Sequence, residues 1–194
     1  MNFFFDLLQG AGIGGASGIR PFLPALVTGG LATSDIAVDF DGTAFAFLES
    51  PVFLIVLVFA AAVTVALEQR GAIGEPLGQG LLAIGVILGA LLAAGSLDDR
   101  ADIWWPGLLV GGAAAALLGI ASRQLLGRVR QRLEEDEQSF LLLYSAGTAL
   151  LVTGASLLFP PLALVALIAG AWLLIASRKR AGEKYAGLRI LNRP

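Results

Sequence analysis

Arg20 is the residue whose type and position most directly suggest chemistry. It lies near the middle of an apolar stretch that runs from residue 3 to residue 31, and Pro21 and Pro24 follow it. A charged side chain at the centre of a bilayer costs at least about 2.5–3.5 kcal/mol, so it must face a partner, a cavity or freed backbone groups. Proline disfavours helical geometry in the residue before it and suits the first turn of a new helix. The sequence therefore predicts that the first span breaks near Gly18–Arg20 and restarts at Pro21.

A helix that restarts inside a membrane would form an anion site. Its first N–H groups have no partner within the helix, its dipole is positive at that end, and Arg20 adds a full charge. We therefore predict that Ser17, Gly18, Arg20 and Pro21 bind an anionic solute or a lipid headgroup, with Ser17 as a neutral donor. In the alternative interpretation, Arg20 only caps carbonyl groups freed by the break or extends its side chain toward the membrane surface.

Two charged residues elsewhere in the chain are candidates for the same site. Glu68 lies at the end of the second apolar run, where it would pair with Arg20, relay a proton, or simply terminate the helix in water. Arg123 is the candidate counterpart of Arg20 in the second half of the chain, although it also fits a basic anchor at a helix end. The predicted substrate-binding set includes both residues.

The residue types argue against an enzyme. The chain contains no histidine and no cysteine, which removes the commonest general base, the commonest transition-metal ligand and thiolate chemistry. Residues 10–15 fit the pattern G-x-G-x-x-G but follow no strand, and residues 15–18 resemble the G-x-S-G motif of rhomboid proteases without the histidine base which that motif needs. We expect no catalytic residue, metal or cofactor, and the net charge of −2 gives no reason to expect a nucleic-acid partner.

The elements that must position these residues are membrane helices. The chain is 57% hydrophobic and 14% charged, whereas soluble domains average about 45–50% and about 25%. Its apolar runs approach the ~20 residues that cross a bilayer and show no polar stripe, which favours membrane spans over a soluble helical bundle. The sequence predicts an all-α membrane protein of six helices, at residues 3–31, 51–68, 76–97, 103–124, 138–159 and 161–177.

The basic residues predict the orientation of these spans. With six crossings, every Lys and Arg except Arg20 and Arg100 falls on the side that holds both termini. This asymmetry places both termini in the cytoplasm of a multi-pass protein of the bacterial inner membrane. The loops on the opposite side are acidic.

The two halves of the chain resemble each other. The segment 15–20 reads Gly-Ala-Ser-Gly-Ile-Arg, and the segment 119–123 reads Gly-Ile-Ala-Ser-Arg. Three crossings per half would make residues 1–97 and 103–177 inverted repeats within a single transmembrane domain, followed by a basic cytoplasmic tail at 178–194. The alternative is chance similarity between apolar segments drawn from a small alphabet.

These motifs resemble a known family. The segment from Ala16 to Pro24 is similar to the opening motif of the domain-of-unknown-function family 4126, which consists of small bacterial membrane proteins. The helix start at residues 49–51 and the triplet at residues 121–123 are similar to the pattern of that family. Gln124 and Leu125 stand where the second motif of the family continues with proline and asparagine, so the second half has diverged. The resemblance implies a membrane protein of this architecture and supplies no activity.

Small residues recur at four-residue spacing in the predicted first and fourth helices, at positions 10, 14 and 18 and at positions 111, 115 and 119. Such glycine-zipper faces let membrane helices approach closely, so we expect these two helices to pack together. The same faces could also form a homodimer, and the sequence does not decide between these uses. The leading hypothesis is a small transporter or channel-like protein for an anionic ligand at Arg20. The alternative is a non-transporting scaffold or assembly factor that acts through Arg128–Glu137 and the basic tail.

Overall fold

The protein is all-helical throughout the part of the chain that the structure describes. The computed structural model describes the backbone of residues 2–130 and 138–190, and the side chains of residues 2–129 and 140–177. Within these ranges lie seven α-helices and a short 3-10 helix and no strand, as the sequence predicted for the fold class. The elements are α1 (Phe3–Ile19), α2 (Phe22–Ala32), η1 (Ala46–Glu49), α3 (Pro51–Gln69), α4 (Glu75–Ala101), α5 (Trp105–Arg130), α6 (Gln138–Leu158) and α7 (Leu162–Ile190).

The helix break at Arg20 and Pro21 is confirmed. Arg20 has extended backbone angles (φ −138°, ψ 107°), which end α1 at Ile19, and Pro21 returns the chain to helical angles (φ −55°, ψ −47°) before α2 begins. The cause is the proline ring, which crowds the helical conformation of the preceding residue.

The chain reverses its direction at this break, which the sequence did not predict. Asp6 of α1 forms an ion pair with Arg100 at the end of α4, whereas Arg20 forms one with Glu68 at the end of α3. After α2, the loop returns to the first end of α1, where Gln9 donates a hydrogen bond to the Ala37 carbonyl. The prediction of one broken span over residues 3–31 is therefore wrong, because two consecutive helices occupy that stretch and run in opposite directions.

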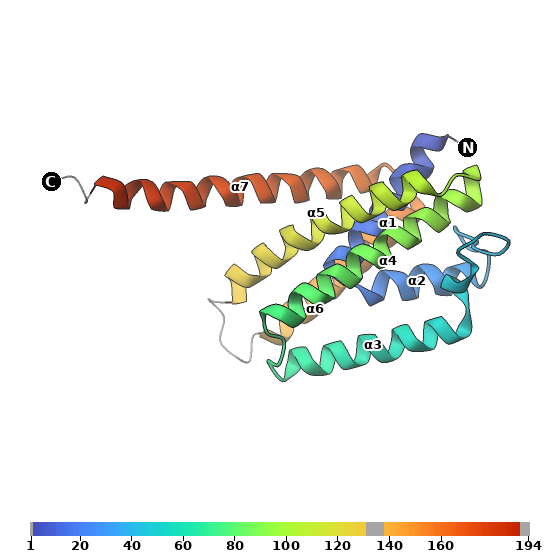
Figure 1. The fold of residues 1–194 in the computed structure, drawn as a ribbon, viewed down its shortest axis with the longest axis horizontal. Helices are drawn as coiled ribbons and strands as arrows, with labels where there is room; N and C mark the ends of the chain where they lie inside the picture. Colours follow the sequence, from blue (N-terminus) through green and yellow to red (C-terminus); the bar gives the residue numbers. More distant parts are fainter. Residues whose placement is uncertain (1, 131–137, 191–194) are drawn as a thin grey trace.

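This additional reversal changes where the first and the last described helices end. Figure 1 shows that α1 begins at one end of the bundle and that α7 ends at the other. Along α7, Ala163 lies beside Gly12 of α1, and Ser177 lies within hydrogen-bond distance of Gln124 on α5. The prediction that both termini lie on one side rested on a single span before residue 32, and the reversal corrects it.

The helices that carry the two similar motifs run in the same direction. The backbone of Gly14 on α1 lies against Gly111 on α5, and that of Gly18 lies further along against Ala115. Inverted repeats would run their corresponding helices in opposite directions. The matching motifs of α1 and α5 therefore do not correspond to an inverted pair in this structure.

The core is built around α1. Its side of closest packing faces α4 and α5, and it also contacts α6 and α7. Every residue from Leu8 to Gly18 is buried. A Cβ at Gly14 would lie 2.7–2.9 Å from backbone atoms of Gly111 and Gly89, so only glycine allows this separation. The expected packing of the predicted first and fourth helices is thus confirmed.

The outer surface has the character of a membrane protein. In the part of the chain that the structure describes, four helices are long and apolar enough to cross a membrane: α3, α4, Trp105–Val129 of α5 and Phe140–Leu158 of α6. Large apolar side chains are exposed on this surface, with Phe59 at 71% and Leu143 at 71%. Water would penalise such surfaces and lipid tails would not, which indicates a bilayer around the bundle.

The end of the bundle where α1 begins is covered by the loop over residues 33–50. Phe40 and Leu48 of this loop are fully buried, and the Phe40 ring packs against Gly95 of α4. Beneath the loop, Arg100 forms an ion pair with Asp6 at 3.1 Å and donates a hydrogen bond to the Ala37 carbonyl. The loop is therefore attached to both α1 and α4.

Candidate functional site

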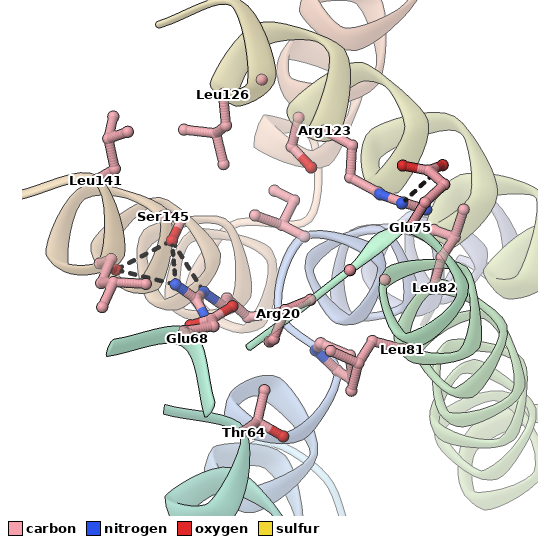
Figure 2. Close-up of a pocket in the computed structure, with 18 of the residues that line it drawn as sticks. Arg20, Thr64, Glu68, Glu75, Leu81, Leu82, Arg123, Leu126, Leu141 and Ser145 are labelled. Atoms are coloured by element: carbon pink, nitrogen blue, oxygen red, sulfur yellow. Dashed lines mark hydrogen bonds and ion pairs between the residues drawn. The ribbon is translucent and has the colours of Figure 1, made fainter. Parts of the chain in front are cut away.

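A cavity of about 710 Å³ opens at the end of the bundle where α1 gives way to α2. Its walls come from the α1–α2 turn, the end of α3, the beginning of α4, the second half of α5 and the beginning of α6. Figure 2 shows the side chains that line it. The residues that line the cavity and carry charge are Arg20, Glu68, Arg70, Glu75 and Arg123.

Arg20 connects three helices across this cavity. Its Nη1 donates to Glu68 Oε2 at 2.5 Å, and its Nε and Nη2 donate to the hydroxyl of Ser145 at 2.9 and 2.6 Å. Nη2 also lies 3.4 Å from the Leu142 carbonyl of α6. The guanidinium group therefore holds the α1–α2 turn against both α3 and α6 (Figure 2).

The Arg20–Glu68 ion pair is shielded only in part. The side chain of Arg20 is 12% exposed and that of Glu68 is 22% exposed. Glu68 reaches this position because α3 begins at a well-defined point: Pro51 occupies its first turn, and the Ser50 hydroxyl accepts a hydrogen bond from the Phe53 N–H at 3.3 Å. The helix then places Glu68 one residue before its end, beside Arg20.

A second ion pair lines another part of the cavity. Arg123 of α5 lies 3.6 Å from Glu75 at the first turn of α4, and its guanidinium passes over the backbone of Gly78. This pair is more open to solvent, since the side chain of Arg123 is 35% exposed and that of Glu75 is 78% exposed. An exposed ion pair of this kind has little net stability, so Arg123 is available to another anion.

The charge balance of the cavity is positive. Among the residues whose side chains the structure describes, three arginines and two glutamates line it, which gives a formal charge of +1 when all five are ionised. Charges inside a cavity with low-dielectric walls act on a ligand more strongly than charges on an open surface. The described part of the lining therefore favours an anion.

The structure brings five of the six predicted site residues together. Gly18, Arg20, Pro21, Glu68 and Arg123 all line the cavity. The exception is Ser17, which is fully buried and whose hydroxyl donates to the Ile13 carbonyl of its own helix at 3.2 Å. Ser17 does not reach the cavity because the last turn of α1 directs it into the packing against α4, where Gly85 lies against its carbonyl.

Ser145 is the partner of Arg20 that the sequence analysis missed. Its hydroxyl accepts hydrogen bonds from Arg20 and donates to the Leu142 carbonyl at 3.0 Å. The signal for it was weak, because Ser145 is one of three serines in an uncharged, mostly apolar helix, and such a hydroxyl can be satisfied within its own helix. Only the fold shows that this serine faces an arginine 125 residues away in sequence.

The predicted scaffold surface lies largely outside the described residues. α5 continues as a helix to Arg130, but residues 131–137 of the charged segment Arg128–Glu137 fall outside the description. α7 continues as a helix through the basic triplet at residues 178–180 to Ile190.

Comparison with protein-family models gives one match, which covers nearly the whole chain. The model described as "Domain of unknown function (DUF4126)" matches residues 7–180. No curated protein and no solved structure matches the chain.

Proposed function

We propose that this chain, which belongs to the family described as Domain of unknown function (DUF4126), is a small membrane transporter for an anionic ligand. The ligand binds in the cavity beside Arg20. The observation that supports this proposal is a cavity of about 710 Å³ with a formal charge of +1, bounded by a helix break.

The Arg20–Glu68 pair would act as a contact that the ligand can replace. A phosphate or carboxylate group offers Arg20 the same two-oxygen geometry that Glu68 offers. Exchange of Glu68 for a ligand would release the end of α3 from the α1–α2 turn, because the Arg20 guanidinium connects them. Ligand binding would thereby be coupled to movement of a membrane helix, which transport requires.

The proposed orientation places the cavity at the cytoplasmic side of the bacterial inner membrane. Arg70 and Arg123 lie at the cavity end, and α7 continues beyond that end through the basic triplet at residues 178–180. The positive-inside rule favours this end for the cytoplasm. The first residues of α1 then lie at the opposite face, beside the acidic loop over residues 33–50.

The proposal is tested with purified protein in phosphatidylcholine vesicles. One set of vesicles is loaded with radiolabelled glycerol 3-phosphate, and a second contains a trace of fluorescent phosphatidylglycerol whose outer-leaflet fraction is bleached by dithionite. We expect protein-dependent movement of one of these two anions at a rate at least about tenfold above empty vesicles. Movement of neither anion, with protein shown to be folded and inserted, would overturn the proposal.

Two variants give this assay its specificity. Arg20→Met removes the proposed ligand-binding cation and is expected to reduce movement to the level of empty vesicles. Ile87→Met changes an exposed α4 side chain, 59% exposed and outside the cavity lining, and is expected to retain the full rate. If both variants moved the anion at the rate of the unchanged protein, Arg20 would have no role in transport.

A scaffold function is the second candidate, and the course of α7 favours it. Figure 1 shows the end of α7 projecting beyond the rest of the bundle, and the second half of α7 contains the basic triplet at residues 178–180. A helix that leaves its bundle offers a surface for a partner or for anionic lipid. Removal of residues 178–194, which include the basic triplet, would abolish such a function and would leave anion movement unchanged.

A further inference from the structure

A second, apolar cavity adjoins the charged one. It has a volume of about 310 Å³ and is formed by α2, α3 and α6. Its apolar lining comes from Phe22, Leu23, Ala61, Val65, Leu143 and Ala146. The polar residues Arg20, Thr64 and Gln69 belong to the linings of both cavities, so the two spaces meet at the helix break.

The apolar cavity opens toward the surface that faces lipid. α3 packs on α2 and η1, with Leu54 of α3 against Gly29 of α2, and only 11% of its membrane span is buried. Toward the end of α3, Val65 is 42% exposed, and Leu143 on the opposite wall is 71% exposed. The mouth of the cavity therefore lies between α3 and α6, on the outside of the bundle.

From this juxtaposition we infer that the ligand is an anionic phospholipid that reaches the site sideways from the bilayer. This inference rests on the proposed function and names its substrate class. The headgroup occupies the charged cavity beside Arg20 and Arg123, and an acyl chain lies in the apolar cavity between α3 and α6. A soluble anion would make use of the first cavity alone and would leave the second without an occupant.

The chemistry of the shared residues supports one continuous site. Arg20 and Thr64 stand where the polar lining changes to the apolar lining. A phospholipid changes in the same order, from phosphate through the glycerol esters to the acyl chain. The charged cavity, at about 710 Å³, is also more than twice the volume of the apolar one, which suits a headgroup larger than a bare carboxylate.

The test separates the two cavities with neighbouring alanines on α3. Ala61 lines the apolar cavity, whereas Ala62 is exposed and lines neither cavity. Ala61→Trp fills the apolar cavity, and Ala62→Trp adds the same side chain to the lipid-facing surface as a matched control. Neither variant alters a charge or the Arg20–Glu68 pair.

Binding is measured on detergent-solubilised protein with phosphatidylglycerol, phosphatidylcholine and glycerol 3-phosphate as the probes. We expect phosphatidylglycerol to bind at least about tenfold more tightly than either of the other two, Ala61→Trp to weaken it about tenfold, and Ala62→Trp to leave it unchanged. Arg20→Met should weaken phosphatidylglycerol binding by at least the same factor.

The alternative outcomes are distinct. Equal affinity for glycerol 3-phosphate and phosphatidylglycerol, with no effect of Ala61→Trp, would overturn the lipid inference and leave an anion transporter in place. Equal affinity for phosphatidylcholine and phosphatidylglycerol would overturn it by removing the role of charge. Phosphatidylglycerol binding without movement in vesicles would retain the lipid site and overturn the transport proposal.

Discussion

The two ends of α1 carry the same kind of contact in different surroundings. At its beginning, Asp6 pairs with Arg100 of α4, and at its end Arg20 pairs with Glu68 of α3. The acid stands near the N-terminus of α1 and the base at its C-terminus, so the helix dipole stabilises both. The buried helix is thus held by one ion pair at each end.

The two ends of α1 differ in how far the rest of the protein covers their ion pairs. The side chain of Asp6 is 4% exposed, and the loop over residues 33–50 attaches to its partner Arg100 through the Ala37 carbonyl. The side chain of Glu68 is 22% exposed and faces the charged cavity. One end is therefore closed and the other is open, which is the arrangement expected for a ligand that binds from one side.

The largest difference between the two ends of α1 should appear in the free energy of unfolding when Arg100 or Arg20 is replaced. Arg100→Met leaves Asp6 buried without its partner, so we expect a loss of about 3–5 kcal/mol in the free energy of unfolding. Arg20→Met leaves Glu68 beside the open cavity, where water can reach it, and we expect a loss of only about 1–2 kcal/mol. Denaturant titration in mixed micelles measures both. Equal losses would mean that the two ends are equally closed.

The sequence predicted where helices begin and break, but it missed the contacts between residues that are far apart in the chain. The sequence predicted a helix from residue 51 on the basis of its apolar run, and it predicted the break at Arg20 from Pro21, because both signals lie in neighbouring residues. The reversal after the break depends on where α2 packs, and an apolar stretch of the right length for one crossing conceals it. The pairing of Asp6 with Arg100 had no local signal, since 94 residues separate them.

The similarity between the two halves was also misleading for a physical reason. Small residues at four-residue spacing in α1 and α5 serve the contact between these helices, as the approach of Gly18 to Ala115 shows. Two helices that share a close interface need similar small residues whatever their directions. The shared pattern of Gly and Ala is therefore explained by the packing of α1 against α5 and does not require an inverted repeat.

A smaller difference in the free energy of unfolding is expected between alanine substitutions at two glycines of α1, Gly18 and Gly10. A Cβ at Gly18 would overlap the carbonyl oxygen of Ala115 and would lie 2.6–2.8 Å from its carbonyl carbon and Cα, and backbone cannot move aside as a side chain can. Gly18→Ala should therefore cost about 1–3 kcal/mol as the helices separate beside the cavity. A Cβ at Gly10 would lie 3.2–3.3 Å from Ala93, so Gly10→Ala should cost less than about 1 kcal/mol. The same titration compares them, and a Gly10 loss equal to that of Gly18 would contradict the structure.

The smallest effect on stability is expected at the rim of the open end. Glu75 is 78% exposed and lies 3.6 Å from Arg123, so Glu75→Gln should change the free energy of unfolding by less than about 1 kcal/mol. The same change releases Arg123 and raises the formal charge of the cavity from +1 to +2, because one of the two glutamates is lost. We therefore expect phosphatidylglycerol to bind about threefold more tightly, with the gain declining as salt is added. Glu49→Gln, in the loop at the closed end, removes the same charge far from the cavity and should leave this affinity unchanged. An equal gain from both variants would show that net charge alone attracts the lipid, and a gain from Glu75→Gln alone would place the attraction at the open end of α1.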